Sequence, residues 1–206
     1  MPRDGAITRT SIMDSAQQLI LNQGFSATSV DSVIEKTGIT KGAFYYHFDT
    51  KAELALALVE RYAAVDHEHL EMNMKQAEEL SRDPLQQMLI FAGLLKAEME
   101  GLIEPFPGCL YASYCYEAQL FTDDTHRIIE DMMLEWRQRL SAKFSAIIKL
   151  YPPKLEVTPE SLADMILVIY EGVFIMSKTL KEPAMTAVQL GQYRNYIELM
   201  FDQSKD

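Results

Sequence analysis

Residues 24–54 contain two short stretches of helical periodicity joined by a turn, and this window constrains the fold more than any other part of the chain. In the first stretch Val30, Val33 and Ile34 recur at the spacing of one helix face, which a partner helix must cover. Gly38 follows where helices commonly end in a left-handed residue, a conformation that glycine adopts without steric cost. The pattern predicts two helices that meet at a tight turn.

The second stretch, residues 40–48, combines core positions with outward-facing polar ones. Phe44 and Phe48 lie four residues apart, as expected for the buried face of a helix, and Thr40 can cap its N-terminus. The side chains left to project elsewhere suit DNA, and they are Lys41, Tyr45, Tyr46 and His47. A helix of this kind after a short turn is the arrangement of a helix-turn-helix DNA reader.

Each of these residues also has a structural explanation. Tyr45 or Tyr46 alone is more often a partly buried packing aromatic, and His47 alone a surface histidine. Thr28 and Ser29 can cap the following helix, whose N-terminal N–H groups can also bind phosphate. The combination of all these residues in one frame favours DNA binding.

The same window resembles the TetR family of one-component transcriptional regulators (TetR/AcrR-like) over roughly residues 8–55. The motif elements that carry the resemblance are Gly24-Phe25, Thr28-Ser29-Val30, Ile34, Gly38-Ile39-Thr40-Lys41-Gly42, Phe44-Tyr45-Tyr46-His47-Phe48 and Lys51-Ala52-Glu53-Leu54. The resemblance implies phosphate contacts from Thr28, Ser29, Tyr45, Tyr46, His47 and Lys51. It implies contacts to base edges from Thr40, Lys41 and Gly42. Phosphate contacts fix the register on the duplex, whereas base-edge contacts specify sequence.

Charge tests this interpretation, because the chain carries a formal net charge of −11. Residues 1–50 hold four basic and five acidic side chains, a balance of −1, and the remaining residues carry −10. The N-terminal segment is therefore not the basic patch of an average nucleic-acid-binding domain. Hydroxyls, backbone donors and helix ends can hold phosphates without net positive charge, so the local arrangement outweighs the balance.

Composition describes the rest of the chain, whose 206 residues are 48% hydrophobic and suffice for one or two domains with a substantial core. No apolar run reaches the roughly 18 residues of a membrane span, and the N-terminus has no signal-peptide pattern. A cytoplasmic protein with no membrane partner is expected. Two cysteines are too few for a disulfide scaffold or a four-ligand zinc site, and neither a metal nor a cofactor is expected.

Helical periodicity continues beyond residue 50 with no convincing strand, which predicts an all-α fold. An N-terminal three-helix helix-turn-helix DNA-binding domain, residues 1–50, is expected to precede a helical effector-binding and dimerisation domain, residues 51–206. A long amphipathic helix beginning near Glu53 is expected to bridge the two.

Residues 158–201 predict two antiparallel helices with strongly apolar faces. TetR-like proteins pair such helices in a two-fold four-helix bundle, so the resemblance implies a homodimer, and two readers on a two-fold axis favour a palindromic operator in double-stranded DNA. The dimer interface is predicted at Ile166, Ile169, Val173, Tyr193, Ile197 and Met200. The alternative that these faces form the core of a single chain stays open.

Residues 106–121 are rich in aromatic side chains, which suit an apolar ligand cavity and equally suit a packed core. The resemblance favours an effector cavity among the middle helices. The residues predicted to line it are Phe106, Tyr111, Tyr114, Glu117, Phe121, Trp136, Tyr170 and Met176. Glu117 is the carboxylate of the aromatic stretch, and it can orient a cation or hydroxyl or else lie on the surface.

These expectations describe a ligand-responsive regulator, by family default a repressor, that leaves its operator when a small, largely apolar effector binds. Two alternatives remain. Cys109 and Cys115 allow thiol-based redox sensing, although on one continuous helix they point apart. A helical small-molecule-binding protein or enzyme is the second, but His67 and His69 diverge on a helix, and no phosphate loop, nucleophile elbow or paired-carboxylate motif occurs. An enzyme is therefore not expected.

Overall fold

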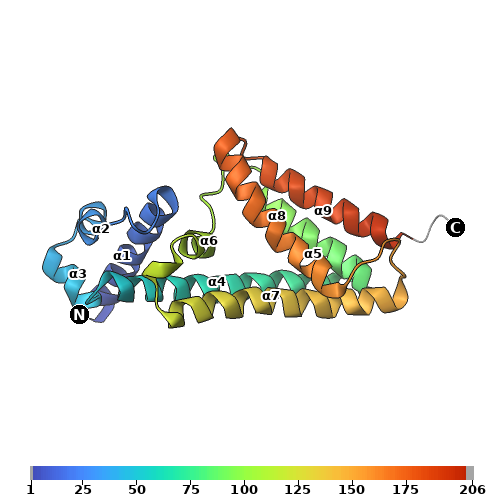
Figure 1. Cartoon of the computed structure of the whole chain (residues 1–206), viewed down its shortest axis with the longest axis horizontal. Coiled ribbons are helices and arrows are strands. Elements are labelled where there is room, and N and C mark those ends of the chain that lie inside the picture. Colours follow the sequence, from blue (N-terminus) through green and yellow to red (C-terminus); the bar gives the residue numbers. More distant parts are fainter. Residues whose placement is uncertain (1, 203–206) are drawn as a thin grey trace. The chain divides into compact units, whose positions relative to one another are not determined.

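The computed structural model describes residues 2–202, and every regular element within that range is a helix, as expected (Figure 1). The first group of helices is α1 (Pro2–Gln23), α2 (Val30–Thr37), α3 (Lys41–His47) and α4 (Lys51–Leu80). The second is α5 (Pro84–Met99), α6 (Leu110–Cys115), the short 3-10 helix η1 (Ala118–Leu120), α7 (Asp123–Leu150), α8 (Pro159–Leu180) and α9 (Met185–Phe201). Among these helices, none combines the length and the apolar character needed to span a bilayer.

The chain forms two compact units. Within the described range, unit 1 contains residues up to 65 together with 107–131, and unit 2 contains residues 66–106 and 132 onward. Both α4 and α7 therefore run from one unit into the other. The functional boundary predicted at residue 50 stays a prediction, because compactness groups the first part of α4 and the segment 107–131 with the N-terminal helices.

Local capping explains the helix-turn-helix segment of unit 1. The Ser29 hydroxyl accepts from the Ser32 N–H, and Ser29 N–H donates back to the Ser32 hydroxyl, which starts α2. Gly38 ends α2 at φ 72°, where its N–H reaches the Ile34 carbonyl at 2.9 Å. The Thr40 hydroxyl then accepts from the Ala43 N–H and starts α3. The predicted turn is confirmed.

Unit 1 closes around apolar side chains from each of its N-terminal helices. The fully or nearly fully buried members are Ile12, Ala16 and Ile20 of α1, Val33 of α2, Phe44 of α3, the adjoining Phe48, and Leu54 and Leu58 of α4. Arg61 of α4 adds polar contacts to α1, with its guanidinium 2.7 Å from Asp14 and 2.8 Å from Gln17. The core therefore fixes α3 by one face and leaves the other free.

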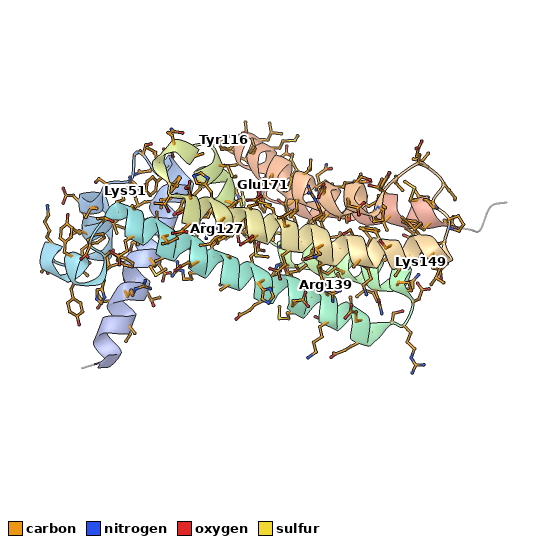
Figure 2. All side chains as sticks on the ribbon, turned by 60° about the horizontal axis from the view of Figure 1, so that its bottom comes forward. Lys51, Tyr116, Arg127, Arg139, Lys149 and Glu171 are labelled. Carbon is orange, nitrogen blue, oxygen red and sulfur yellow. The ribbon has the colours of Figure 1, made fainter. Side chains whose placement is uncertain are left out.

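Unit 2 is built on α5, which α9 covers along its length, with α8 packed beside α9 (Figure 1). Asp83 caps α5 ahead of Pro84, and Thr158 caps α8 ahead of Pro159, so both helices begin with proline where its missing N–H costs nothing. On α7, Arg139 (labelled in Figure 2) donates to Glu71 and Glu78 of α4.

The predicted dimer interface is wrong for most of its residues. Ile166, Val173, Tyr193, Ile197 and Met200 are buried within the single chain, and Ile169 is half-buried. The reason is that α9 packs on both α5 and α8, which places the regular apolar stripes of both C-terminal helices in the core of the same chain. The exposed apolar side chains of these helices are Val168, Ile175, Met176, Leu180, Val188 and Leu199.

Candidate nucleic-acid interface

Helix α3 exposes most of the side chains predicted to contact DNA. Lys41 and Gly42 are exposed, the Tyr46 side chain is 82% exposed, and Tyr45 is 44% exposed. His47 is half-buried and its ring lies edge-on to Tyr46, with centroids 5.0 Å apart. Because the opposite face of α3 is fixed in the core, these side chains have a stable backbone and an open surface.

The N-terminal end of α3 is sterically open. The Lys41 ammonium lies 3.4 Å from the Asp31 carboxylate, and both side chains are largely exposed, so this pair contributes little and can be exchanged for another partner. A Cβ added at Gly42 would meet no atom within 4 Å. Packing within the chain therefore does not require glycine at this position. Close approach of another molecule to the backbone would require it.

The structure contradicts the phosphate contact predicted for Thr28. Its side chain is buried, at 2% exposure, and its hydroxyl donates to the Gly24 carbonyl at 2.8 Å. Thr28 thus holds the α1–α2 loop, residues 24–29, in shape. Ser29 remains exposed at the N-terminus of α2 and caps it, so both interpretations of Ser29 are compatible.

Lys51, at the start of α4 (Figure 2), is directed at the same loop. Its ammonium donates to the Phe25 carbonyl at 2.5 Å and lies 3.9 Å from the centre of the Phe25 ring. Burial lowers the pKa of the Lys51 ammonium, while the nearby Glu117 carboxylate opposes that shift. To reach a phosphate, the Lys51 side chain would have to leave the Phe25 carbonyl.

The structure also corrects the prediction that Glu117 lines an effector cavity. Its carboxylate binds the α1–α2 loop of unit 1. It accepts from the Phe25 N–H at 2.7 Å, from the Ser26 N–H at 2.9 Å, and from the Ser26 hydroxyl. The hydrogen bond from the Ser26 hydroxyl, followed by those from the two backbone N–H groups, holds the pKa of Glu117 below its usual value. Sequence reasoning missed this contact, which joins residues more than 90 positions apart.

Aromatic rings reinforce the same contact. The Phe25 ring lies 4.5 Å from Phe121 and 5.8 Å from Tyr114, and the Tyr114 and Phe121 rings stack at 4.1 Å. The Tyr114 hydroxyl donates to the Ala55 carbonyl of α4, and Tyr111 lies edge-on to Tyr62. The predicted pocket residues of unit 1 therefore pack the segment 107–131 against the α1–α2 loop and the first part of α4.

The predicted pocket residues of unit 2 form separate contacts. Phe106 stacks on Phe174 at 4.7 Å, Tyr170 lies 5.5 Å from Phe174, and Trp136 lies 6.3 Å from Phe91. The Met176 side chain is 52% exposed, so it lies on the surface of the chain and not in its interior.

The two histidines considered for a metal site each bind a different carboxylate. His67 bonds to Glu135 of α7, and His69 bonds to Glu98 of α5 at 2.5 Å. Among the side chains that the structure describes, residues 5–202, no three histidines, cysteines, aspartates or glutamates are grouped as metal ligands would be.

Comparison with known proteins assigns the N-terminal region. Residues 12–58 match the family model described as bacterial regulatory proteins, tetR family. The transcriptional regulator AcuR of Cereibacter sphaeroides is 23% identical over 177 residues, which cover 85% of this chain and 78% of AcuR.

Solved structures share the whole fold. A regulatory protein TetR from Rhodobacter sphaeroides superposes with a TM-score of 0.74 at 20% identity, covering 92% of this chain and 98% of that one. A TetR-family transcriptional regulator from Agrobacterium tumefaciens gives 0.75 at 18% identity, covering 96% and 100%. At this identity the structural similarity establishes the fold of the chain.

Proposed function

We propose that this chain, which belongs to the TetR family of bacterial transcriptional regulators, is a ligand-responsive repressor that binds a palindromic operator in double-stranded DNA. The relatives it matches are transcriptional regulators and not enzymes. The observation that carries the proposal is the exposed polar face of α3, on a short helix whose other face Phe44 fixes in the core. A protein that acts on DNA in this way works in the cytoplasm.

The roles of the side chains follow from their positions on the helices. Residues at the start of a recognition helix reach base edges, so we assign that role to Thr40, Lys41 and Gly42. The residues assigned to phosphates are Ser29, Tyr45, Tyr46, His47 and Lys51. These contacts position the protein on the duplex and carry no sequence information of their own.

Selection of bound sequences from a random duplex pool by the purified full chain tests this proposal. We expect a palindromic sequence to be enriched, because two copies of one reader related by a two-fold axis contact two equal half-sites. Tyr45→Ala is the control and should enrich little or nothing. Failure of the wild-type protein to enrich any sequence at low salt would contradict the proposal.

The homodimer is part of the same proposal, with an interface that differs from the one expected from sequence. The exposed apolar residues Val168 and Ile175 are seven apart on α8, and Val188 and Leu199 are eleven apart on α9, so each pair lies along one side of its helix. Between the α8 pair, a Cβ added at Gly172 would meet nothing within 4 Å. These two outer stripes are where a second copy can pack.

Replacing Ile175 with aspartate should weaken dimerisation by about tenfold or more, because a carboxylate would be buried in an apolar interface. Sedimentation velocity over a range of concentrations measures this. Leu155→Asp is a suitable control, since Leu155 is similarly exposed, at 59%, but lies outside these helices. An unchanged association constant for Ile175→Asp would exclude the outer stripe of α8 from the interface.

Effector response is proposed to reach the reader through the chain connections between the units. The chain crosses from one unit to the other at residues 65–66, 106–107 and 131–132. Of the three crossings, the last two flank the segment whose Glu117 holds the α1–α2 loop. An effector that binds one conformation of unit 2 more tightly than another would change the populations of the conformations of the helix-turn-helix segment. An effector with equal affinity for both conformations of unit 2 would change neither population.

Redox sensing through the thiols is the less well supported alternative. Cys109 is buried and caps the N-terminus of α6, and Cys115 is exposed and is the last residue of that helix. We expect peroxide to change operator affinity by less than about twofold in the wild-type protein, because a buried thiol reacts slowly and a helix holds the two apart. Anisotropy titrations before and after peroxide check this. Release of the wild type but not of a Cys109→Ser, Cys115→Ser variant would establish thiol sensing instead.

A further inference from the structure

We infer that the operator interface extends to α1, where the Arg9 guanidinium binds a backbone phosphate beside the end of α3. The side chains proposed to contact DNA all come from residues 29–51, so Arg9 adds a contact from the first helix of the chain. The inference rests on the proposed function, because the phosphate belongs to the operator. Its evidence is the position of Arg9, the contacts that hold its side chain, and the donors that these contacts leave over.

Two neighbouring positions of α1 lie close to the end of α3. A Cβ added at Gly5 would lie 3.8 Å from the Cε1 atom of His47, the last residue of α3. Four residues later, the guanidinium carbon of Arg9 lies 4.7 Å from the centre of the Phe48 ring, and Phe48 is the C-cap of α3. Residues four apart share one face of a helix. This face of α1 therefore follows the last turn of α3 and carries Arg9 beside it.

The Arg9 side chain is held by its neighbours, and most of its donors stay available. Its Nη1 atom donates to the Met13 sulfur at 3.3 Å, and both Met13 and Phe48 are buried. A guanidinium has five N–H donors in one plane, and this contact uses one of them. Among the described side chains no carboxylate pairs with Arg9, whereas Arg61 of the same unit pairs with Asp14. Because Arg9 is exposed, its remaining donors are available to another molecule.

The chemistry of this side chain suits a phosphate. The planar donors of a guanidinium match two oxygens of one phosphate, and its positive charge persists throughout the physiological pH range. A cation over an aromatic ring at an exposed site gains only about 0.5–1 kcal/mol, so the Phe48 ring orients the Arg9 guanidinium without competing strongly with an anion. Since Phe48 and Met13 already restrict the side chain, binding a phosphate costs less side-chain entropy. Arg9 is therefore preorganised for such a contact.

The end of α3 is also where phosphates are expected. The proposed function places the start of α3 at base edges, on the floor of a major groove about 8.5 Å deep. The seven residues of α3 span about 10 Å at a rise of about 1.5 Å per residue. A helix that enters the groove with its first residues therefore has its last turn near the phosphates that border the groove. His47 belongs to that turn and Arg9 lies beside it, so both can reach the same stretch of DNA backbone.

The salt dependence of operator binding distinguishes a phosphate contact from a purely structural one. Each phosphate contact contributes about 0.9 to the steepness with which the logarithm of the association constant falls against the logarithm of the salt concentration. Arg9→Gln should therefore reduce this slope by about 0.9 and weaken operator binding about tenfold at fixed salt. Arg9→Met should give the same two losses while its apolar side chain still covers Phe48. Anisotropy titrations of the full-length variants over a range of salt concentrations measure both quantities.

Two further variants control for net charge and for folding. Arg127→Gln removes the same charge from an exposed side chain of unit 1 that lies on α7, and it should change the slope by less than about 0.3. Arg9→Lys keeps the charge and should keep the slope. An unchanged slope in Arg9→Gln, or equal changes in Arg9→Gln and Arg127→Gln, would overturn the inference. A reduced slope in Arg9→Lys would overturn it as well, because the substitution and not the lost charge would then cause the change.

Titrations with a duplex of unrelated sequence separate this inference from the proposed function. Phosphate contacts carry no sequence information, so Arg9→Gln should weaken binding to the operator and to the unrelated duplex by factors that agree within about threefold. A loss confined to the operator would contradict a phosphate contact. If the wild type bound every duplex equally, the proposed function would fail, and the slope of Arg9→Gln on those duplexes would still test the contact. Absence of any DNA binding by the wild type at low salt would overturn both.

Discussion

Replacing Gly42 with glutamate should abolish sequence-specific DNA binding while leaving unit 1 folded. Gly42 is exposed near the start of α3, and a Cβ there would meet no atom of the chain within 4 Å, so the free protein can accept a side chain. On DNA the same side chain would occupy the space proposed for base edges and would place a carboxylate beside the phosphates. We expect operator affinity to fall at least about 100-fold, the combined effect of lost base contacts and repulsion.

Fluorescence anisotropy with the selected operator at fixed salt measures this loss, and circular dichroism confirms the fold. Gln18→Glu is the matched control, since it adds the same charge at an exposed position of α1, and it should change affinity by less than about threefold. Equal losses in the two variants would mean that net charge and not the face of α3 governs binding. Retention of affinity by Gly42→Glu would remove α3 from the interface.

The helix-turn-helix segment could be predicted because its determinants are local. The left-handed Gly38 and the hydroxyl caps Ser29 and Thr40 each act over three or four residues, and Phe44 and Phe48 repeat once per helical turn. A sequence window displays all of these directly. The order and type of the elements in unit 1 follow from such signals.

The dimer surface could not be predicted from the same kind of signal. A periodic apolar stripe identifies the face of a helix that is buried, but it does not distinguish burial in the same chain from burial against a second copy. Tyr193 and Ile197 belong to the strongest stripe of α9, and α5 and α8 of the same chain cover it. The exposed stripes are less regular, so sequence reasoning passed over them.

Contacts distant in sequence were also beyond prediction. Nothing near Glu117 in the sequence indicates that its carboxylate binds Phe25 and Ser26, and nothing near Lys51 indicates that it reaches the same loop. Gly24 is the residue of this loop whose type relates most directly to the contact. Its φ of 85° is a backbone conformation that favours glycine, and an added Cβ would lie 3.0 Å from a Glu117 oxygen. Only the folded arrangement of unit 1 explains why the carboxylate and the glycine meet.

Replacing Glu117 with alanine should lower the free energy of unfolding by about 2 kcal/mol, because three donors lose a charged acceptor and water replaces it only in part. The same substitution should also weaken operator binding about tenfold. The α1–α2 loop, which leads into α2, would then become ordered only on binding, and this ordering would reduce the free energy of binding. Chemical denaturation and anisotropy titrations measure the two effects. Glu130→Ala removes the same charge at an exposed position of unit 1 and should leave both values nearly unchanged.

The pH dependence of stability distinguishes loss of this carboxylate from general loosening of the loop. The pKa of Glu117 is lowered in the folded protein from its ordinary 4.5, so its contribution is complete above that value and disappears as the pH falls through the folded pKa. The stability difference between wild type and Glu117→Gln should therefore be largest at neutral pH and shrink in acid. A difference that stayed constant down to acid pH would assign the effect to packing of the side chain and would leave the α1–α2 loop without an electrostatic link to residues 107–131.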